Sequence, residues 1–382
     1  MKTKAFLPAI VFLLASLASC NSSVPKSLVT NDGSVRIIEN PDGPLYICDL
    51  KAAGDTIDIP LSELVEDCRI VRFETSDEAL FKAWWIEVSD NYICVRQQSN
   101  VVKLYDKDGK FLCNIGAMGN GPGEYPVTIY DGSIDERGGH IFLSLFYGKK
   151  IMMYGLDGKW IKDINLPGQI NKPKIEVNAD GTLSVVHMPF EEGTPIAFRM
   201  DTDGNILSQI PALDYMLAGN FDNEIFSYRN TGTFDFFYTG IDTTFTYDTE
   251  ANKLIPRFTM NFPGFAQKPI HIYTELPNHI LIHYYTWDKG RFTPGGDILV
   301  DKMKMSSSQY HLVNDFYGNL PIPNPNKGRF IFNVEPAALQ EMIEAHLASG
   351  KCPPEAKAQL KELDTTLHEN DNNLMFVGKL KR

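Results

Sequence analysis

Short segments in which apolar and polar residues alternate recur along most of this chain. Residues 92–96, 141–144 and 183–187 are three of them, and each is followed by two more segments joined by an Asp-Gly step. Period-two alternation is typical of β-strands with one buried face, and Asp-Gly readily adopts the positive φ angles that a tight hairpin needs. The pattern therefore predicts a succession of β-hairpins.

These hairpins return at a nearly constant interval. Their turns begin at Asp108, Asp157, Asp203, Asp248 and, after a longer gap, Asn314. The first two intervals are 49 and 46 residues, and four short strands per 40–50 residues is the period of a β-propeller blade. The repeats predict five blades over residues 84–322. A sixth blade would combine segments from both termini, at 330–332, 374–377 and 68–73. We therefore expect an all-β six-bladed propeller that both termini close.

One stretch near the C-terminus departs from the strand pattern. Within residues 336–369, apolar residues recur at helical spacing at Leu339, Met342, Ile343 and Leu347. Pro336 suits the first turn of a helix, and a break at Gly350 precedes a second helical pattern. We expect a helical insertion within the last blade that covers an apolar end of the propeller, with a docking helix for a partner as the alternative.

The loop from Gly116 to Pro126 carries the most specific motif. A glycine-rich loop, an aromatic residue and a proline precede a strand at 140–144 and a Tyr-x-x-Asp-Gly hairpin, an order that resembles an NHL-type repeat. The sequence segments at 57–67 and 372–376 are similar to those of bacterial six-bladed β-propeller lipoproteins, a largely uncharacterised family. The resemblance implies an NHL-like or YWTD-like propeller and a lipid anchor, and it implies no particular activity. Ser144-Leu145 departs from the NHL pattern, which usually has an aspartate there.

The N-terminus has the form of a secretory signal. Two lysines precede an apolar run from residue 5 to 17 that is too short to cross a bilayer. The following Leu-Ala-Ser-Cys resembles a lipobox, which implies cleavage before Cys20 and acylation of that residue. We expect a lipoprotein signal peptide at 1–19, a lipidated tether at 20–44 and the propeller at 45–382. An ordinary cleaved signal is the alternative.

The composition limits the kinds of partner and the cellular compartment that we expect for this protein. The 382 residues are 43% hydrophobic, which suits a large core, and the net charge is −12 with no basic stripe of the kind that binds nucleic acid. We expect attachment to a membrane of the cell envelope, and we favour the outer membrane. Whether the protein faces the periplasm or the cell surface is left open. Besides the acylated Cys20, five cysteines would remain after cleavage, so they cannot all pair with one another, and whether any do is left open.

Aligning the repeats gives a candidate ligand site. Equivalent positions near the ends of the segments expected to be inner strands hold Arg96, Ser144, His187, Tyr238 and His283. Equivalent ends of inner strands meet around the central channel of a propeller, where such side chains suit an anionic or sugar-like ligand. With a carboxylate or a third histidine, the neutral imidazoles of His187 and His283 would also suit a divalent metal. A polar channel lining without a ligand is the alternative, and a one-residue slip in register would turn these side chains away.

Two further motifs are candidates for binding. A loop with backbone N–H groups suited to a phosphate consists of Gly119, Gly121, Pro122, Gly123, Glu124 and Tyr125. It matches neither the Walker nor the dinucleotide fingerprint, so an interblade turn is the simpler interpretation. Aromatic groups that could stack on sugars, anchor a protein interface or pack between blades are Trp84-Trp85, Tyr284-Tyr285 and Trp287.

Taken together, these patterns favour a binding or scaffolding module over an enzyme. The chain has no G-x-S-x-G, H-E-x-x-H or EF-hand motif, and no cofactor is expected. We expect recognition of a glycan, a peptide or a partner protein in the cell envelope. The alternative is an NHL-like lyase or hydrolase that works in the central channel with a divalent metal.

Overall fold

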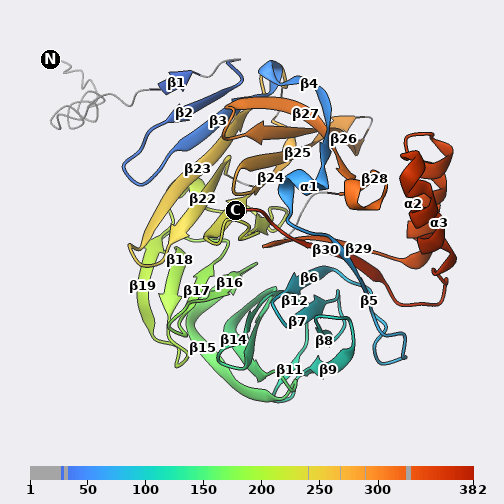
Figure 1. Ribbon diagram of the computed structural model, residues 1–382. Coiled ribbons are helices and arrows are strands. Elements are labelled where there is room, and N and C mark those ends of the chain that lie inside the picture. The colour runs from blue at the N-terminus through green and yellow to red at the C-terminus, as the bar shows by residue number, and fades with distance from the viewer. Residues whose placement is uncertain (1–26, 30–32, 240, 267, 289, 324–327) are drawn as a thin grey trace, which may run out of the picture.

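The structure is a computed structural model that describes residues 27–29, 33–239, 241–266, 268–288, 290–323 and 328–382. Six blades surround a central axis, which runs roughly along the line of sight in Figure 1. The predicted all-β six-bladed propeller is therefore confirmed. The predicted signal peptide and the predicted lipidation site Cys20 lie outside the described residues.

Blades 1 to 3 are four-stranded antiparallel sheets whose strands follow chain order. Blade 1 contains β6 (Trp85–Val88), β7 (Tyr92–Arg96), β8 (Val102–Asp106) and β9 (Phe111–Ile115). Blade 2 contains β12 (Ile129–Asp135), β13 (His140–Leu145), β14 (Tyr147–Gly155) and β15 (Trp160–Asn171). Blade 3 contains β16 (Lys174–Val177), β17 (Leu183–Val186), β18 (Pro195–Met200) and β19 (Ile206–Pro211). The first strand of each blade lies nearest the axis, where β12 and β16 pack on each other.

Blades 4 and 5 are enlarged by strands from the N-terminal region. Blade 4 contains β20 (Ile225–Phe226), β21 (Phe234–Tyr238), β22 (Thr243–Asp248) and β23 (Lys253–Asn261), followed at its edge by β3 (Leu45–Asp49), β2 (Val35–Ile38) and β1 (Ser27–Val29). Blade 5 contains β24 (Ile270–Glu275), β25 (His279–Asp288), β26 (Arg291–Asp301), β27 (Ser306–Asn314) and β28 (Leu320–Pro321), with β4 (Gly54–Pro60) parallel to β27. Part of the segment expected as a tether at 20–44 thus forms strands. The buried side chain of Val35 packs against the core between blades 4 and 5.

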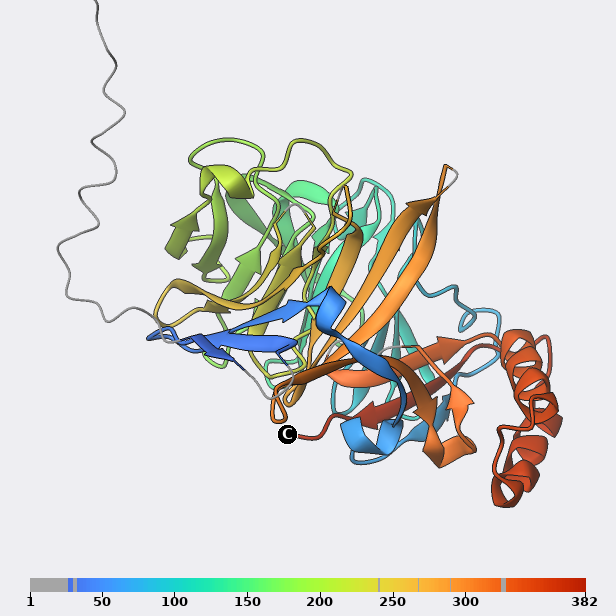
Figure 2. The same cartoon turned by 90° about the horizontal axis from the view of Figure 1, so that it is seen from above.

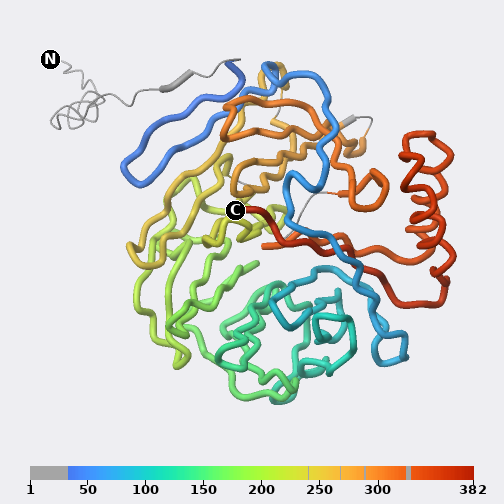
Figure 3. The backbone as a smooth tube through the Cα atoms, in the orientation of Figure 1, coloured from blue at the N-terminus to red at the C-terminus, as the bar shows by residue number. Residues whose placement is uncertain are grey.

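Blade 6 closes the ring with strands from both ends of the chain. Its order is β29 (Arg329–Val334), β30 (Leu374–Lys379) and β5 (Arg69–Arg72), as predicted. Figure 3 shows the blue N-terminal segment and the red C-terminal segment side by side at this blade. The remaining short elements are η1 (Leu50–Ala52), α1 (Leu61–Leu64), β10 (Ala117–Met118), β11 (Glu124–Tyr125), η2 (Asp214–Met216), η3 (Asp315–Tyr317) and η4 (Pro354–Ala356).

The predicted helical insertion is confirmed between β29 and β30. Its helices, α2 (Pro336–Ala348) and α3 (Lys357–Thr365), stand at the side of the propeller rather than over the channel (Figure 2). Leu339 and Ile343 of α2 and Leu360 of α3 are fully buried in one cluster with the outer strands of blade 5 and with blade 6. The pair therefore seals the outer edge where these two blades meet.

Ring closure should depend on Phe376, which lies fully buried on the middle strand of blade 6. Its ring packs on Tyr317 and Phe332, with centroids 5.2 and 5.8 Å away. We predict that Phe376→Ala lowers the free energy of unfolding by about 3–5 kcal/mol in urea denaturation, because it leaves a cavity in a packed core. Leu207→Ala, at a side chain 52% exposed on β19, is the control and should change little. An equal effect of both substitutions would contradict this account of closure.

Candidate functional site

The five aligned positions do not line the channel directly. All five belong to the second strand of a blade or directly follow it, one strand away from the axis, as the pairing of Trp85 on β6 with Arg96 on β7 shows. Four of them lie at or next to the end of that strand, whereas His283 lies in the middle of β25. The expectation that these are inner strands is therefore wrong. The true inner strands β6, β12, β16 and β24 mix charged with apolar residues, and β20 has only two residues, so the inner strands alternate less clearly in the sequence. Because second strands run antiparallel to inner ones, the strand ends at Arg96, Ser144, His187 and Tyr238 still share the face where the inner strands begin, called here the mouth face.

Arg96 nevertheless reaches the centre of the molecule. Its side chain is 1% exposed, and one guanidinium nitrogen lies 3.0 Å from the Asp131 carboxylate of β12 in the neighbouring blade. Another donates a hydrogen bond to the backbone carbonyl of Tyr130. The guanidinium also lies over the ring of Trp85, 5.8 Å from its centroid. Arg96 thus joins blade 1 to blade 2 rather than presenting a free cation.

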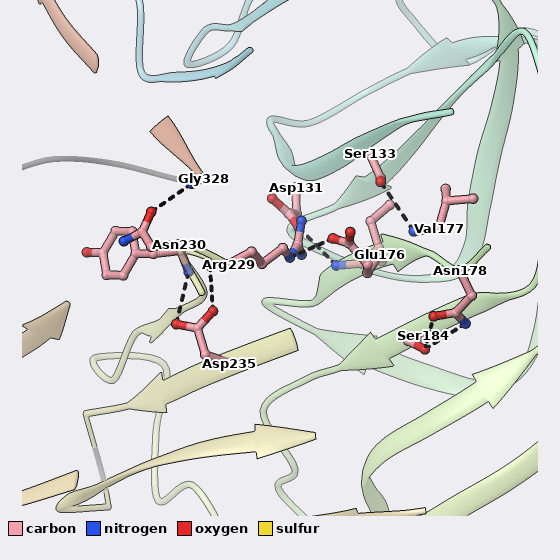
Figure 4. Close-up of polar contacts among 12 residues, drawn as sticks. Asp131, Ser133, Glu176, Val177, Asn178, Ser184, Arg229, Asn230, Asp235 and Gly328 are labelled. Atoms are coloured by element: carbon pink, nitrogen blue, oxygen red, sulfur yellow. Dashed lines mark hydrogen bonds and ion pairs between the residues drawn. The ribbon is translucent and has the colours of Figure 1, made fainter. Parts of the chain in front are cut away.

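Arg229, which the sequence analysis missed, is the centre of the channel network (Figure 4). It follows β20 in blade 4, and its guanidinium lies 3.3 Å from Asp131 and 2.8 Å from Glu176 on β16. Asp131 also accepts a 2.9 Å hydrogen bond from the backbone N–H of Ile175. The adjacent Asn230 side chain accepts a 2.7 Å bond from the backbone N–H of Gly328, which precedes blade 6. Charged and amide groups from blades 1, 2, 3, 4 and 6 therefore converge on one site.

The backbone at Arg229 is held in an unusual conformation. Its φ of +53° lies in the left-handed region that favours glycine. The Asp235 carboxylate of β21 accepts hydrogen bonds from the backbone N–H groups of Tyr228 and Arg229, which fixes this turn. Burial raises the pKa of Asp235 to about 7, although these hydrogen bonds and Arg229 act to lower it. The turn that positions Arg229 thus contains a carboxyl group that titrates near neutral pH.

His187 and His283 lie on different blades and line different cavities. His187 follows β17 and is 1% exposed, with Nδ1 3.3 Å from the Met188 carbonyl oxygen. Burial lowers the pKa of His187 to about 4. It borders a cavity of about 680 Å³ between blades 2 and 3. No group of three or more His, Cys, Asp or Glu side chains within the described ranges is arranged to hold a metal ion.

His283 borders a cavity of about 1100 Å³, which crosses one face of blade 5 toward helix α2. Its Nδ1 lies 2.7 Å from the Asp297 carboxylate on β26, and its ring meets the ring of Tyr285 edge-on with centroids 4.4 Å apart. Tyr238, the last of the proposed channel residues, is 2% exposed and packs in the core of blade 4. The structure therefore distributes the predicted ligand residues instead of gathering them.

The glycine-rich loop connects blade 1 to blade 2, and its backbone is held by contacts with side chains of the same loop. The backbone N–H of Gly121 donates a 2.8 Å hydrogen bond to the Glu124 carboxylate, and a Cβ added at Gly119 would lie 2.0 Å from that carboxylate. Tyr125 is fully buried and its hydroxyl bonds to the backbones of Val102 and Ile115. Glu124 therefore occupies the place where a phosphate would sit, which favours the interpretation as an interblade turn.

The mouth of the channel carries a third cavity, of about 720 Å³, with an aromatic lining. Its aromatic side chains come from the starts of inner strands and from nearby connections: Trp84, Trp85, Tyr130, Phe146, Tyr147 and Phe226. Polar groups border the same space: Gln98, Ser99, Thr128, Lys174 and Glu224. The Lys174 ammonium lies over the rings of Trp85 and Tyr130, 5.3 and 4.5 Å from their centroids. This cavity thus combines flat apolar faces with hydrogen-bonding groups.

Exposed aromatic side chains gather on the mouth face. Within the described residues, the large aromatic side chains more than a third exposed are Trp84, Tyr147, Trp160, Tyr215, Phe221, Phe265, Trp287 and Phe292. All but Trp160 lie in connections or strand ends at this face, including the tip of the β25–β26 hairpin, which projects from the molecule in Figure 2. Clusters of exposed aromatic residues mark interaction sites.

These features define a six-bladed β-propeller with an ion-paired channel and an aromatic mouth. The chain belongs to the family described as Domain of unknown function (DUF4934), whose model matches residues 45–379. The predicted membership of a largely uncharacterised propeller family is thereby confirmed. No curated protein matches the sequence significantly.

Two solved structures from Bacteroides are similar to this chain. A Bacteroides fragilis protein described as exported is 15% identical with a TM-score of 0.61, and the match covers 88% of this chain and 100% of that chain. A member of the DUF4221 family from Bacteroides vulgatus is 10% identical with a TM-score of 0.46, covering 84% and 98%. At such identity the first likeness shows the fold alone. In the described part of this chain, no helix is long and apolar enough to cross a membrane.

The central ion pairs should be essential for stability. We predict that Arg229→Met lowers the free energy of unfolding by about 3–5 kcal/mol, because it leaves the buried Asp131 with one cationic partner fewer. Lys253→Met, which removes an exposed ion pair with Asp42, is the control and should have little effect. Urea denaturation measures both. Equal stability of the Arg229 variant and the parent protein would show that the network does not join the blades.

His187 should make stability depend on pH. Because its folded pKa is lowered to about 4 from an unfolded value near 6.5, it contributes stability above pH 6.5 that is lost as the pH falls toward 4. The expected loss is about 3 kcal/mol for a shift of this size. Denaturation at several pH values should show a shallower slope over this range for His187→Gln, which stays neutral. An unchanged slope would contradict the assigned burial of the imidazole.

Proposed function

We propose that this protein is a lipid-anchored recognition module of the cell envelope that binds carbohydrate at the aromatic mouth of its channel. The observation that carries the proposal is the lining of the 720 Å³ cavity, where aromatic rings alternate with amide, hydroxyl and charged groups. Its volume is in the range of ordinary small-ligand sites. A sugar presents an apolar ring face and a rim of hydroxyl groups, which fits such a lining.

The ion-paired network inside the channel supports binding at the mouth rather than deep in the channel. The charges of Arg96, Asp131, Arg229 and Glu176 are matched with one another at short distances. A ligand entering that network would have to replace strong buried ion pairs, which is costly. The mouth, by contrast, offers Trp84 and Tyr147 with 36% and 49% of their surfaces exposed.

Anchoring in the envelope rests on the N-terminal sequence. The basic start, the short apolar run and the Leu-Ala-Ser-Cys ending support export and acylation at Cys20. The described chain begins at β1, on the outer edge of blade 4, away from the channel. An anchor joined at this edge leaves the mouth face accessible to a ligand.

The alternative of a lyase or hydrolase in the channel depends on His187 and His283 acting together. They border separate cavities, and His187 is 1% exposed. Recognition is therefore the function that the geometry supports better.

Binding should depend on Trp84. We predict that Trp84→Ala weakens the binding of carbohydrates selected on a glycan array about tenfold, equivalent to 1.4 kcal/mol, because a stacking platform is lost. Trp160→Ala is the matched control, since Trp160 is similarly exposed, at 41%, but lies on the outer strand β15. Thermal melting confirms that both variants are folded. If no glycan binds the parent protein, or if both variants weaken binding equally, the proposal is wrong.

A further inference from the structure

A continuous series of aromatic rings leads away from the channel mouth across blades 2 and 3. The series runs in the order Trp84, Tyr130, Phe146, Phe221 and Phe190, and is called here the aromatic ladder. Successive ring centroids are 5.7, 5.5, 6.0 and 4.5 Å apart. The last two contacts are stacked, with interplanar angles of 28° and 30°. The ladder therefore extends well beyond the space that one sugar ring would cover.

The far end of the ladder borders a second cavity. This cavity of about 680 Å³ is lined by Phe190 and Phe221 together with Gln169, Asn171, Thr194 and Gln209. It has the same combination of ring faces and hydrogen-bonding groups as the mouth. Asn171 is paired in the sheet with Tyr147, which lines the mouth cavity. The two cavities thus lie on either side of one pair of neighbouring strand residues.

Hydrogen bonds from the side chain of Lys172 hold the loop that carries Phe221 in place. The buried Lys172 ammonium donates hydrogen bonds of 2.7 and 2.6 Å to the carbonyl oxygens of Phe221 and Asn223 and pairs with the Glu224 carboxylate. It also lies 5.3 Å from the centroid of the Phe146 ring. Glu224 in turn accepts a hydrogen bond from the Tyr130 hydroxyl. Because these contacts fix the middle of the ladder before any ligand arrives, little ordering is required on binding.

We propose that the two cavities are contiguous subsites for one carbohydrate chain, which runs along the aromatic ladder from the channel mouth to the cavity between blades 2 and 3. This inference rests on the proposed function, since it takes the mouth as the first subsite. It adds that the ligand is an oligosaccharide or polysaccharide rather than a single sugar. Contacts at both ends of one chain reinforce each other, so affinity rises with chain length until both subsites are filled.

The test is a titration series on the mature chain, residues 20–382. Cello-, malto- and chito-oligosaccharides of increasing length, from disaccharides to hexasaccharides, are the probes, and binding is measured by calorimetry. We expect at least one series to bind about tenfold or more tightly at the hexasaccharide than at the disaccharide. Phe221→Ala should retain the disaccharide affinity and lose this gain. Phe221 is 45% exposed, so the substitution should leave the fold intact.

Two variants separate failure of this inference from failure of the proposed function. Trp84→Ala should weaken short and long chains alike, and Trp160→Ala should change neither. An affinity that does not change with length, with Trp84 still required, would overturn the second subsite and leave the mouth as a binding site. Absence of binding by every series would overturn both.

Discussion

The Asp131 carboxylate is the point on which the arrangement of the blades depends. It pairs with Arg96 from blade 1 and with Arg229 from blade 4, and it accepts the backbone N–H of Ile175 in blade 3. Elsewhere the propeller blades pack through apolar faces, which stabilise the contact between blades but do not fix their relative orientation. A buried charge with several fixed donors also fixes the orientation of the blades, because displacement of any one of them would remove a partner from that charge. The left-handed turn at Arg229 is tolerated because these contacts and Asp235 hold it.

This network also decides where a ligand can bind. With its charges matched, the middle of the channel gains little from a guest molecule. Trp84 and Tyr147 at the mouth are exposed, and the Lys172 contacts hold the adjoining loop in place. A rigid base and an accessible aromatic rim together favour recognition over chemistry. The blade 5 cavity, with the hydrogen-bonded His283 and Asp297, is a further large space that could hold a ligand.

Much of the fold could be predicted from the sequence because hairpins leave a strong local signal. The Asp-Gly turns and the alternation in β13 and β17 defined the blades, and the terminal strands β5 and β30 were predicted to close the ring. The site was harder to predict. The inner strand β20 is only two residues long, and others such as β12 and β16 mix charged with apolar residues, so the pattern pointed to second strands instead. Arg229 and Asp235 lie in and beside an irregular turn whose importance appears only when distant blades meet. The Trp84-Trp85 pair was recognisable, but its continuation through Phe146 and Phe221 depends on contacts between residues far apart in the chain.

The most direct test is a crystal structure of residues 20–382 with a bound hexasaccharide, at a resolution that places individual sugar rings. We expect one chain whose sugar rings stack on Trp84 and Tyr147, pass over Phe221 and leave the Asp131–Arg229 ion pair intact. A ligand seated instead against His283 and Asp297 on blade 5, or one that displaces Arg229 from Asp131, would contradict this expectation.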